Sequence, residues 1–263
     1  MFDLSAIQRD SFIRKAEYVP VVDSTNNRAL ELAAEEKIEL PYLILAGQQT
    51  AGRGRGANRW WTGPGALAWS VVLDSESLGL TPENWPRVSL TAALAVCETI
   101  KQLAPDAACG IKWPNDVLVG GRKICGVLPE LPRPVSHARP LPKRLVLGVG
   151  INVNNSLQTA PPEVASLATS LVDLTGRTHD LTDVLLRVLA RLERHLIALA
   201  EGDPNLSAAW AERCLLRGRM VEIMQGDRRI RGTCGGIADD GGLWLDTGEG
   251  PRRVYSGVVA KDF

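Results

Sequence analysis

The longest regular pattern in the chain is a leucine stripe between residues 180 and 202, DLTDVLLRVLARLERHLIALAEG. Leucines recur there every three or four residues, which places them on one face of a helix. About three heptads is short for a coiled coil, so the stripe indicates a helix that faces the core of its own domain. Such a helix must pack against a sheet or other helices. The stripe consists of Leu181, Leu185, Leu189, Leu192, Leu196 and Leu199.

Between residues 17 and 154, short apolar segments separated by turn residues predict β-strands. The Gly120–Gly121 pair lies between two of them and predicts a hairpin turn. Three more helices are expected, one capped by Ser24 or Thr25, one over Trp85–Leu103 and a short one in NLSAAWAERC at 205–214. The strands are expected at 17–24, 41–49, 65–74, 110–130 and 144–154, and Pro114 interrupts the fourth.

The composition changes after Leu216. From there on, apolar pairs are separated by Gly-Asp, Asp-Asp-Gly-Gly and Gly-Glu-Gly turns, which is typical of short antiparallel strands. We therefore predict a larger domain at 1–216 and a small β-barrel-like domain at 217–263. A domain of under about 50 residues has too small a core to stand alone, so it is expected to pack against the larger one. A Pro-rich stretch at 132–144 predicts a surface connection.

Positive charge is concentrated in one segment. Lys plus Arg number 30 and so do Asp plus Glu, so the chain as a whole has no field that attracts nucleic acid or membrane. The segment 48–61, QQTAGRGRGANRWW, carries three arginines, and no acidic residue occurs between Leu40 and Leu73. A glycine-rich turn with arginines fits a phosphate. Alone it fits a solvated basic loop equally well, and it matches neither a P-loop nor a Rossmann fingerprint.

Two lysines and an aspartate are further candidates. In KWPND, at 112–116, Pro114 ends a strand, so Asn115 and Asp116 are expected on a turn. Lys112 offers a point charge for a phosphate and Asp116 offers oxygen ligands for a divalent metal. An Asx-type turn beside a lysine is the alternative. Lys123 enters an apolar strand, where it must find a partner or keep its ammonium in water. The segment GVGIN at 148–152 by itself indicates no more than a turn.

Taken together and in this order, the segments resemble the catalytic domain of biotin protein ligases, a fold shared with lipoate ligases and class II aminoacyl-tRNA synthetases. The resemblance covers about residues 17–155 by motif and the C-terminal β-domain by composition. It implies an α+β fold, with a central mixed or antiparallel sheet, flanking helices and a small SH3-like barrel. The motifs are DSTN (23–26), QTAGRGR (49–55) with Trp60, KWPND (112–116), RKICGVL (122–128) and GVGINV (148–153).

The resemblance implies an ATP-dependent ligase that works in two steps. Biotin and ATP, with Mg²⁺, give biotinyl-5′-adenylate and pyrophosphate. The biotinyl group then passes to a lysine of a biotin carboxyl carrier protein domain, such as that of acetyl-CoA carboxylase. A glycine-arginine loop that folds over the adenylate would exclude water and so protect the mixed anhydride from hydrolysis.

The resemblance also implies roles for individual residues. The catalytic residues that it implies are Arg53, Arg55, Lys123 and Asp116. The three cations would neutralise the biotin carboxylate and the α-phosphate, and Asp116 would orient ATP and hold Mg²⁺. The biotin contacts are Ser24, Thr25, Asn26, Gln49, Arg53, Gly54, Arg55, Lys123 and Gly126. The ATP or adenylate contacts are Arg53, Arg55, Trp60, Lys112, Asn115, Asp116 and Asn152.

Two positions depart from the family pattern. After GRGR the loop reads Gly-Ala-Asn-Arg, where many relatives have another basic residue and a glycine. This bears only on fine details of adenylate retention. Pro129 stands where an aliphatic residue is expected, and because it lacks a backbone donor the strand should end there or lie at an edge.

Several partners and locations are not expected. Only about 17 residues precede the first strand, too few for a three-helix DNA-binding domain, so DNA is not an expected partner. The N-terminus does not read as a signal peptide, and no apolar run reaches the roughly 18 residues of a membrane span. The five cysteines lack metal-binding spacing and are expected to be free thiols in a reducing cytoplasm. The resemblance does not decide whether the oligomeric state is a monomer or a homodimer.

Three alternatives compete with a biotin ligase. A lipoate-type ligase needs the same positive loop, but the pairing of GRGR with KWPND and a C-terminal β-domain favours biotin. A non-catalytic biotin-sensing or adenylate-binding module could lack Lys123 or Asp116, and both are present. A nucleic-acid binder with one short basic loop would make few phosphate contacts and bind weakly.

Overall fold

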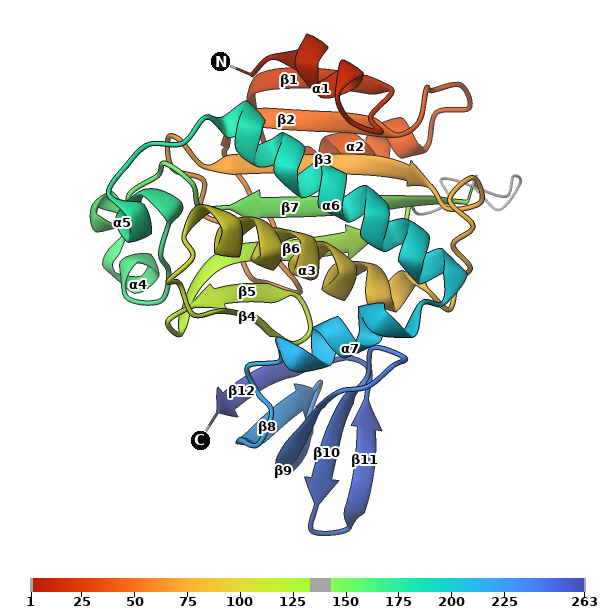
Figure 1. Cartoon of the computed structure of the whole chain (residues 1–263), viewed down its shortest axis with the longest axis vertical. Coiled ribbons are helices and arrows are strands. Elements are labelled where there is room, and N and C mark those ends of the chain that lie inside the picture. The colour runs from red at the N-terminus through yellow and green to blue at the C-terminus, as the bar shows by residue number, and fades with distance from the viewer. Residues whose placement is uncertain (1, 133–142, 263) are drawn as a thin grey trace.

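The computed structural model describes residues 2–132 and 143–262. A seven-stranded sheet carries most of the helices, and a five-stranded sheet lies beyond it at the C-terminal end (Figure 1). This arrangement confirms the predicted α+β class with a mixed central sheet and a separate C-terminal sheet of the SH3-like kind. The predicted Pro-rich connection, apart from its ends, lies outside the described residues.

The large sheet is mixed because β1, the strand at one edge, runs parallel to β2, whereas every other neighbouring pair is antiparallel. The strand order is β1-β2-β3-β7-β6-β5-β4. The strands overlap the segments predicted from the sequence. They span Lys15–Val22 (β1), Tyr42–Gln49 (β2), Leu67–Asp74 (β3), Cys109–Lys112 (β4), Asp116–Val119 (β5), Arg122–Glu130 (β6) and Arg144–Ile151 (β7).

Strand β6 continues through Pro129 and does not end there, but Pro129 lies at an edge as predicted. The Val127 N–H points away from β7 and donates to the Asn115 carbonyl at 2.9 Å. Pro129 lies two residues later, so its missing N–H falls on the same side. Strand β5 pairs with β6 only from Arg122 to Gly126, so no ladder hydrogen bond is lost at the proline.

One face of the large sheet is covered by α3 (Trp85–Leu103) and α6 (Leu181–Glu201), which pack against each other (Figure 1). The leucine stripe of α6 turns toward this core, as predicted. Asp180 accepts the Asp183 N–H at the start of the helix, and Gly202 ends it in the left-handed conformation. The buried members of the stripe are Leu185, Leu189, Leu192, Leu196 and Leu199.

The opposite face is only partly covered, by α2 (Thr25–Ala33). Ile44, Val72 and Val146 alternate with strand residues of the main core and pack under α2 in a small second cluster. Further along β7 on this same face stand Gly148 and Gly150. Within residues 2–132 and 143–262, neither a helix nor a side chain from β7 fills this part of the face, and Gly148 and Gly150 line a cavity there.

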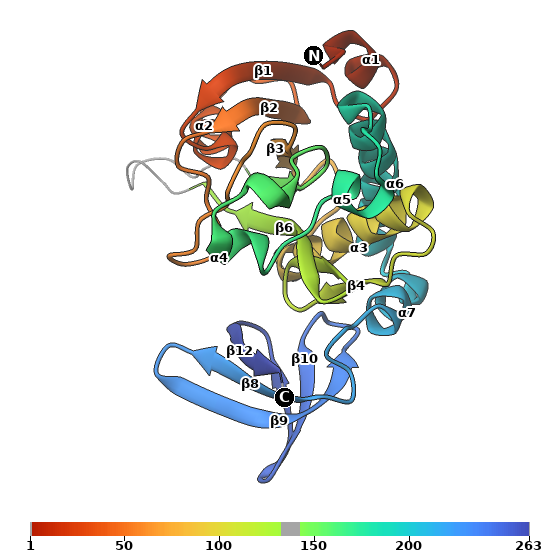
Figure 2. The same ribbon diagram turned by 90° about the vertical axis from the view of Figure 1, so that its left-hand side faces the viewer.

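The C-terminal sheet is antiparallel, in the order β11-β10-β9-β8-β12. Helix α7 (Pro204–Glu212) lies between the two sheets (Figure 2). The Trp113 indole donates to the Gly241 carbonyl at 3.0 Å, and the buried apolar residues of both sheets form one cluster. The small sheet thus packs on the larger region, while a domain boundary at residue 216 stays a prediction. Its strands are Met220–Gln225 (β8), Arg228–Ile237 (β9), Leu243–Thr247 (β10), Gly250–Val254 (β11) and Val258–Asp262 (β12).

The short helices were not predicted, because four to six residues hold no readable helical period. They are α1 (Leu4–Arg9), α4 (Pro162–Ala165) and α5 (Leu171–Thr175), with a 3₁₀ turn at Leu157–Thr159. All five cysteines are free, as predicted. Within 2–132 and 143–262 no helix combines the length and apolarity that crossing a bilayer requires.

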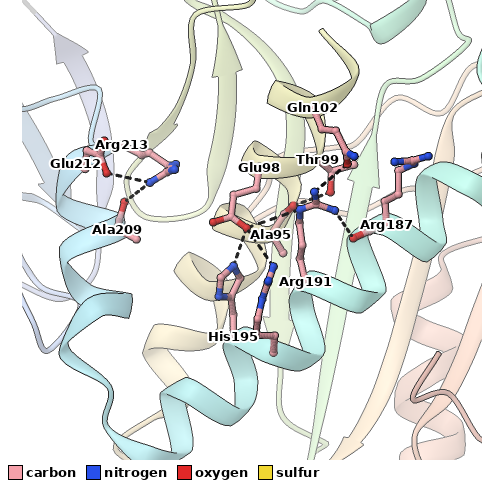
Figure 3. Close-up of polar contacts among 11 residues, drawn as sticks. Ala95, Glu98, Thr99, Gln102, Arg187, Arg191, His195, Ala209, Glu212 and Arg213 are labelled. Carbon is pink, nitrogen blue, oxygen red and sulfur yellow. Dashed lines mark hydrogen bonds and ion pairs between the residues drawn. The ribbon is translucent and has the colours of Figure 1, made fainter. Parts of the chain in front are cut away.

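A charged cluster fixes α6 against α3 on the side away from α2 (Figure 3). The Glu98 carboxylate of α3 lies 2.9 Å from His195 Nε2, 3.8 Å from Arg191 Nε and 3.9 Å from Arg194 Nη2, all three on α6. Burial opposes ionisation of Glu98. The His195 hydrogen bond and the nearby charges, including Arg213 before β8, nevertheless hold the pKa of this carboxyl below its usual value.

Glu98→Gln is expected to remove an acid-sensitive part of the stability. Because the folded pKa of Glu98 is depressed, its stabilisation is fully present above the pKa of an unfolded glutamate, near 4.5, and is lost as pH falls through the folded pKa. The parent should therefore exceed the variant by about 1 kcal/mol at pH 6 and converge on it toward pH 3. Urea unfolding of the parent and the variant between pH 3 and pH 6 measures the difference in the free energy of unfolding and its pH dependence. A pH-independent difference would contradict the assignment.

Candidate active site

A cavity of about 510 Å³ opens on the part of the sheet that α2 leaves uncovered. Its wall includes the first turn of α2, the loop from Arg53 to Trp60, the Lys112–Asp116 turn before and into β5, and residues 257–259 at the start of β12. The cavity therefore draws on both sheets. The C-terminal strand joins a site whose other lining residues come from the segment between Ser24 and Leu167.

The floor of the cavity is made of glycines. Gly126 of β6 is paired with Gly150 of β7, and Gly148 lies two residues away on the same face. A Cβ at Gly148 would overlap the Asn26 side-chain amide, and one at Gly150 would overlap the Trp60 indole. None of the three glycines has a positive φ. They therefore serve to create space and not to permit an unusual backbone conformation.

The first turn of α2 holds a buried polar network. Thr25 donates to Gln49 Oε1 from its N–H at 2.8 Å and from its hydroxyl at 3.1 Å. The Ser70 hydroxyl lies 2.7 Å from Thr25 Oγ1 and 2.6 Å from Asn26 Oδ1. Asn26 Nδ2 donates to the Leu128 carbonyl at 3.1 Å. Because each group is held by another, these side chains present a fixed set of donors and acceptors to the cavity.

Glu130 joins this network to the arginine loop. Its Oε2 accepts from Asn26 Nδ2 at 2.8 Å, and its Oε1 lies 2.6 Å from Arg53 Nη2. Arg53 also donates to Asn27 Oδ1 at 2.9 Å. Sequence reasoning missed both Glu130 and Ser70. The available signal was a polar residue inside or at the end of an otherwise apolar strand, LAWSVVL or ICGVLPE.

The arginine loop is folded on itself beside the cavity. Trp60 N–H donates to the Gly52 carbonyl at 2.9 Å and Gly54 N–H to the Asn58 carbonyl at 2.8 Å. Arg55 leaves the loop toward the C-terminal sheet, where its Nη1 donates to the Gly257 carbonyl at 3.1 Å. Burial lowers the pKa of Arg55, and the negative charge of Asp116 opposes that shift. The loop therefore brings a partly desolvated cation to the cavity.

A second cation lies across the β5–β6 hairpin. Lys123 Nζ is 2.7 Å from Asp116 Oδ1 and 5.6 Å from the centre of the Trp60 ring. Asp116 begins β5 and does not sit on the predicted turn, which comprises residues 113–115. The Asn115 amide donates to the Val127 carbonyl at 2.7 Å. Among the described residues that line the cavity, Asp116 is the one carboxylate, and the cations are Arg53, Arg55, Arg59, Lys112 and Lys123. The cavity therefore suits an anionic ligand.

The structure brings together all but one of the predicted site residues. Asn152, expected on the nucleotide side, does not line the cavity. Strand β7 ends at Ile151, and the 3% exposed Asn152 donates from Nδ2 to the Thr169 carbonyl at 3.0 Å. The Asn152 amide therefore serves as the hydrogen-bond donor for a buried backbone carbonyl. Those that line the cavity are Ser24, Thr25, Asn26, Gln49, Arg53, Gly54, Arg55, Trp60, Lys112, Asn115, Asp116, Lys123 and Gly126.

Gly148→Ala is expected to lower the free energy of unfolding by about 1–3 kcal/mol, as overpacking does. The new methyl group would overlap the Asn26 amide, which cannot move without breaking its bonds to Ser70 and Glu130. Chemical denaturation measures the loss. Gly120→Ala would be a poor control because Gly120 has a positive φ, so Gly248→Ala, which meets no atom within 4 Å, is the matched control. Equal effects in both would show that Gly148 has no special packing role.

Comparison with protein families agrees with the architecture. Residues 18–152 match the biotin/lipoate A/B protein ligase family. Residues 217–262 match the biotin protein ligase C-terminal domain. The first match contains the cavity walls contributed by the large sheet, and the second contains the strand that completes the cavity.

Individual relatives cover most of the chain. The chain is 34% identical to the biotin–[acetyl-CoA-carboxylase] ligase of Mycobacterium tuberculosis, over 94% of this chain and 88% of that protein. It is 32% identical to the bifunctional ligase/repressor BirA of Bacillus subtilis, over 92% of this chain and 72% of that protein. Among solved structures, the biotin protein ligase of Aquifex aeolicus in complex with biotin and ATP aligns with a TM-score of 0.79 and 30% identity, covering 93% of this chain and 97% of that one.

Proposed function

The chain belongs to the biotin/lipoate A/B protein ligase family, and from this premise we propose that its cavity binds biotin and ATP and joins biotin to a carrier protein. In the first step a biotin carboxylate oxygen bonds to the α-phosphorus of ATP and pyrophosphate leaves. In the second step the neutral ε-amine of a carrier lysine bonds to the acyl carbon of biotinyl-5′-adenylate, AMP leaves and the amine releases a proton. The carrier is a domain of a biotin-dependent carboxylase.

The observation that carries this proposal is the pair of cations beside a glycine floor. Arg55 and Lys123 come from different segments and converge on one cavity next to Gly126 and Gly150. Bringing a carboxylate onto an α-phosphate requires that both anions be neutralised and that nothing obstruct their approach. The cations meet the first requirement and the glycines meet the second.

In this proposal one group of residues binds biotin and another binds the nucleotide. The rigid network at the first turn of α2 takes the neutral polar ring of biotin, since it offers fixed neutral donors and acceptors around Thr25 and Asn26. The turn that bears Lys112 and Asn115 takes the nucleotide. Trp60, whose buried Nε1 has no hydrogen-bond partner among the described residues, supplies an apolar face and a free donor beside Lys123.

A Mg²⁺ ion carried by ATP fits the same cavity. Asp116 Oδ1 is buried, and its partner among the described residues is the Lys123 ammonium at 2.7 Å. Mg²⁺ in nucleotide sites is commonly held by one or two carboxylates together with the phosphates. The described residues contain no cluster of three metal-binding side chains, which agrees with an ion that arrives with its nucleotide. When bound, it would supply charge neutralisation at the departing pyrophosphate.

The test is exchange of labelled pyrophosphate into ATP by the purified protein. Exchange is expected with biotin and not with lipoate or without an acid. Exchange with lipoate alone would identify a lipoate-type ligase instead. No exchange with either acid, together with a biotin-induced rise in melting temperature, would identify a non-catalytic biotin-binding module.

A further inference from the structure

Two exposed apolar side chains stand at the rim of the cavity. Leu167 is 70% exposed and follows α4, and Val258 is 54% exposed and begins β12. They are the two large exposed apolar residues among those that line the cavity in the described part of the chain. They come from the large and the small sheet regions respectively, and α4 and β12 lie on the same side of the molecule (Figure 2). We call Leu167 and Val258 the apolar rim pair.

The backbone at or next to each member of the rim pair is hydrogen-bonded to a residue that supplies a cation of the site, through the backbone N–H of Lys123 and through the guanidinium of Arg55. The Leu167 carbonyl accepts the Lys123 N–H at 2.8 Å, and the Gly257 carbonyl, next to Val258, accepts from Arg55 Nη1 at 3.1 Å. The rim pair is therefore anchored to the backbone of Lys123 and to the Arg55 guanidinium. Because both side chains line the cavity and are exposed, a macromolecule seated over its mouth would contact them.

We propose, on the basis of the function above, that the apolar rim pair is a docking contact for the folded carrier domain that accepts biotin. A lysine side chain spans five bonds, about 6 Å from Cα to Nζ. The carrier backbone must therefore come within that distance of the acyl carbon, so the surface around its lysine must lie against the rim. An apolar rim is matched by apolar side chains beside that lysine.

The rim pair suits a transient partner. Two isolated apolar contacts bury little surface, which is typical of weak and short-lived complexes. A modifying enzyme must release its carrier after each transfer, so a small contact is sufficient. Each apolar side chain that is buried on docking still contributes to affinity in proportion to the apolar surface it removes from water. The rim pair should therefore govern the reaction with the carrier and not the reaction that makes the adenylate.

The test compares Leu167→Asn, Val258→Thr and the double variant with the parent. Both changes keep the approximate size and the net charge. Ile197→Thr is the matched control, because Ile197 is 48% exposed on α6, away from the cavity. Three reactions are measured on each protein: biotin-dependent pyrophosphate exchange, transfer to an unbiotinylated carrier domain of an acetyl-CoA carboxylase, and transfer from preformed adenylate to hydroxylamine, which needs no docking.

We expect kcat/KM for the carrier to fall about fivefold in each single variant and at least about 20-fold in the double variant, roughly additively for separated contacts. Exchange and hydroxamate formation should stay within twofold of the parent, and Ile197→Thr should match the parent throughout. Unchanged carrier transfer in the double variant would overturn the inference. So would an equal loss in all three reactions, which would place the pair in adenylate formation. Absence of exchange in the parent would instead refute the proposed function.

Discussion

Replacing Lys123 with alanine is expected to lower biotin-dependent pyrophosphate exchange by at least about 100-fold. Lys123 is held by Asp116 and lies over the Trp60 ring, so its ammonium has a defined position at the cavity. In the proposed reaction that ammonium neutralises the carboxylate and the phosphate as they approach. A preorganised charge of this kind is worth more inside a partly desolvated site than in water, because water need not be reorganised around it.

Two further variants separate this role from a structural one. Lys143→Ala removes a lysine whose side chain is 68% exposed and should leave exchange unchanged. Lys123→Arg retains the positive charge and should recover part of the activity, although its guanidinium is wider than the ammonium. Melting temperatures of all three proteins show whether the fold survives. Exchange within threefold of the parent in a folded Lys123→Ala protein would remove this residue from the reacting centre.

Arg55→Gly is expected to release the activated intermediate, so that biotin labels lysines of unrelated proteins. Arg55 ties the loop to the C-terminal sheet through the Gly257 carbonyl. In the proposed complex it also holds the acyl phosphate. A charged hydrogen bond contributes about 1.5–3 kcal/mol, so its loss should speed escape of the adenylate by roughly 10- to 100-fold. Blotting for biotin on a bystander protein, such as an albumin, measures the released adenylate.

The same variant should lose part of its biotin-dependent exchange, because one of the two cations is gone, and should retain the rest, because Lys123 remains in place. Arg55→Lys keeps the charge but cannot make the same planar contacts, so its bystander labelling should be intermediate. Arg14→Gly removes an arginine remote from the cavity and serves as the control for the glycine substitution. Bystander labelling by Arg55→Gly no greater than by this control would exclude a retaining role for Arg55.

Several elements could be predicted because their sequences carry a strong local period. The α6 stripe, the α3 segment and the short apolar strands are each specified by residues a few positions apart. The missing N–H of Pro129 predicted that its strand would either end there or lie at an edge, and the structure shows the second. The position of Asn152, by contrast, does not follow from local sequence. Whether an asparagine faces a ligand or a backbone carbonyl depends on which segment folds over it, here residues 168–171, and local sequence does not state that.

By itself the sequence determined the order of the elements, the basic glycine loop and the polar residues of each motif, because these depend on covalent neighbours and on local periodicity. The tertiary structure alone decided that Glu130 would link Arg53 to Asn26 and that Gly257 would bind Arg55. These contacts join residues 77 to 202 positions apart. Their formation depends on how helices and sheets pack over the whole chain, since burial selects the strand register and leaves each buried polar group to find its partner.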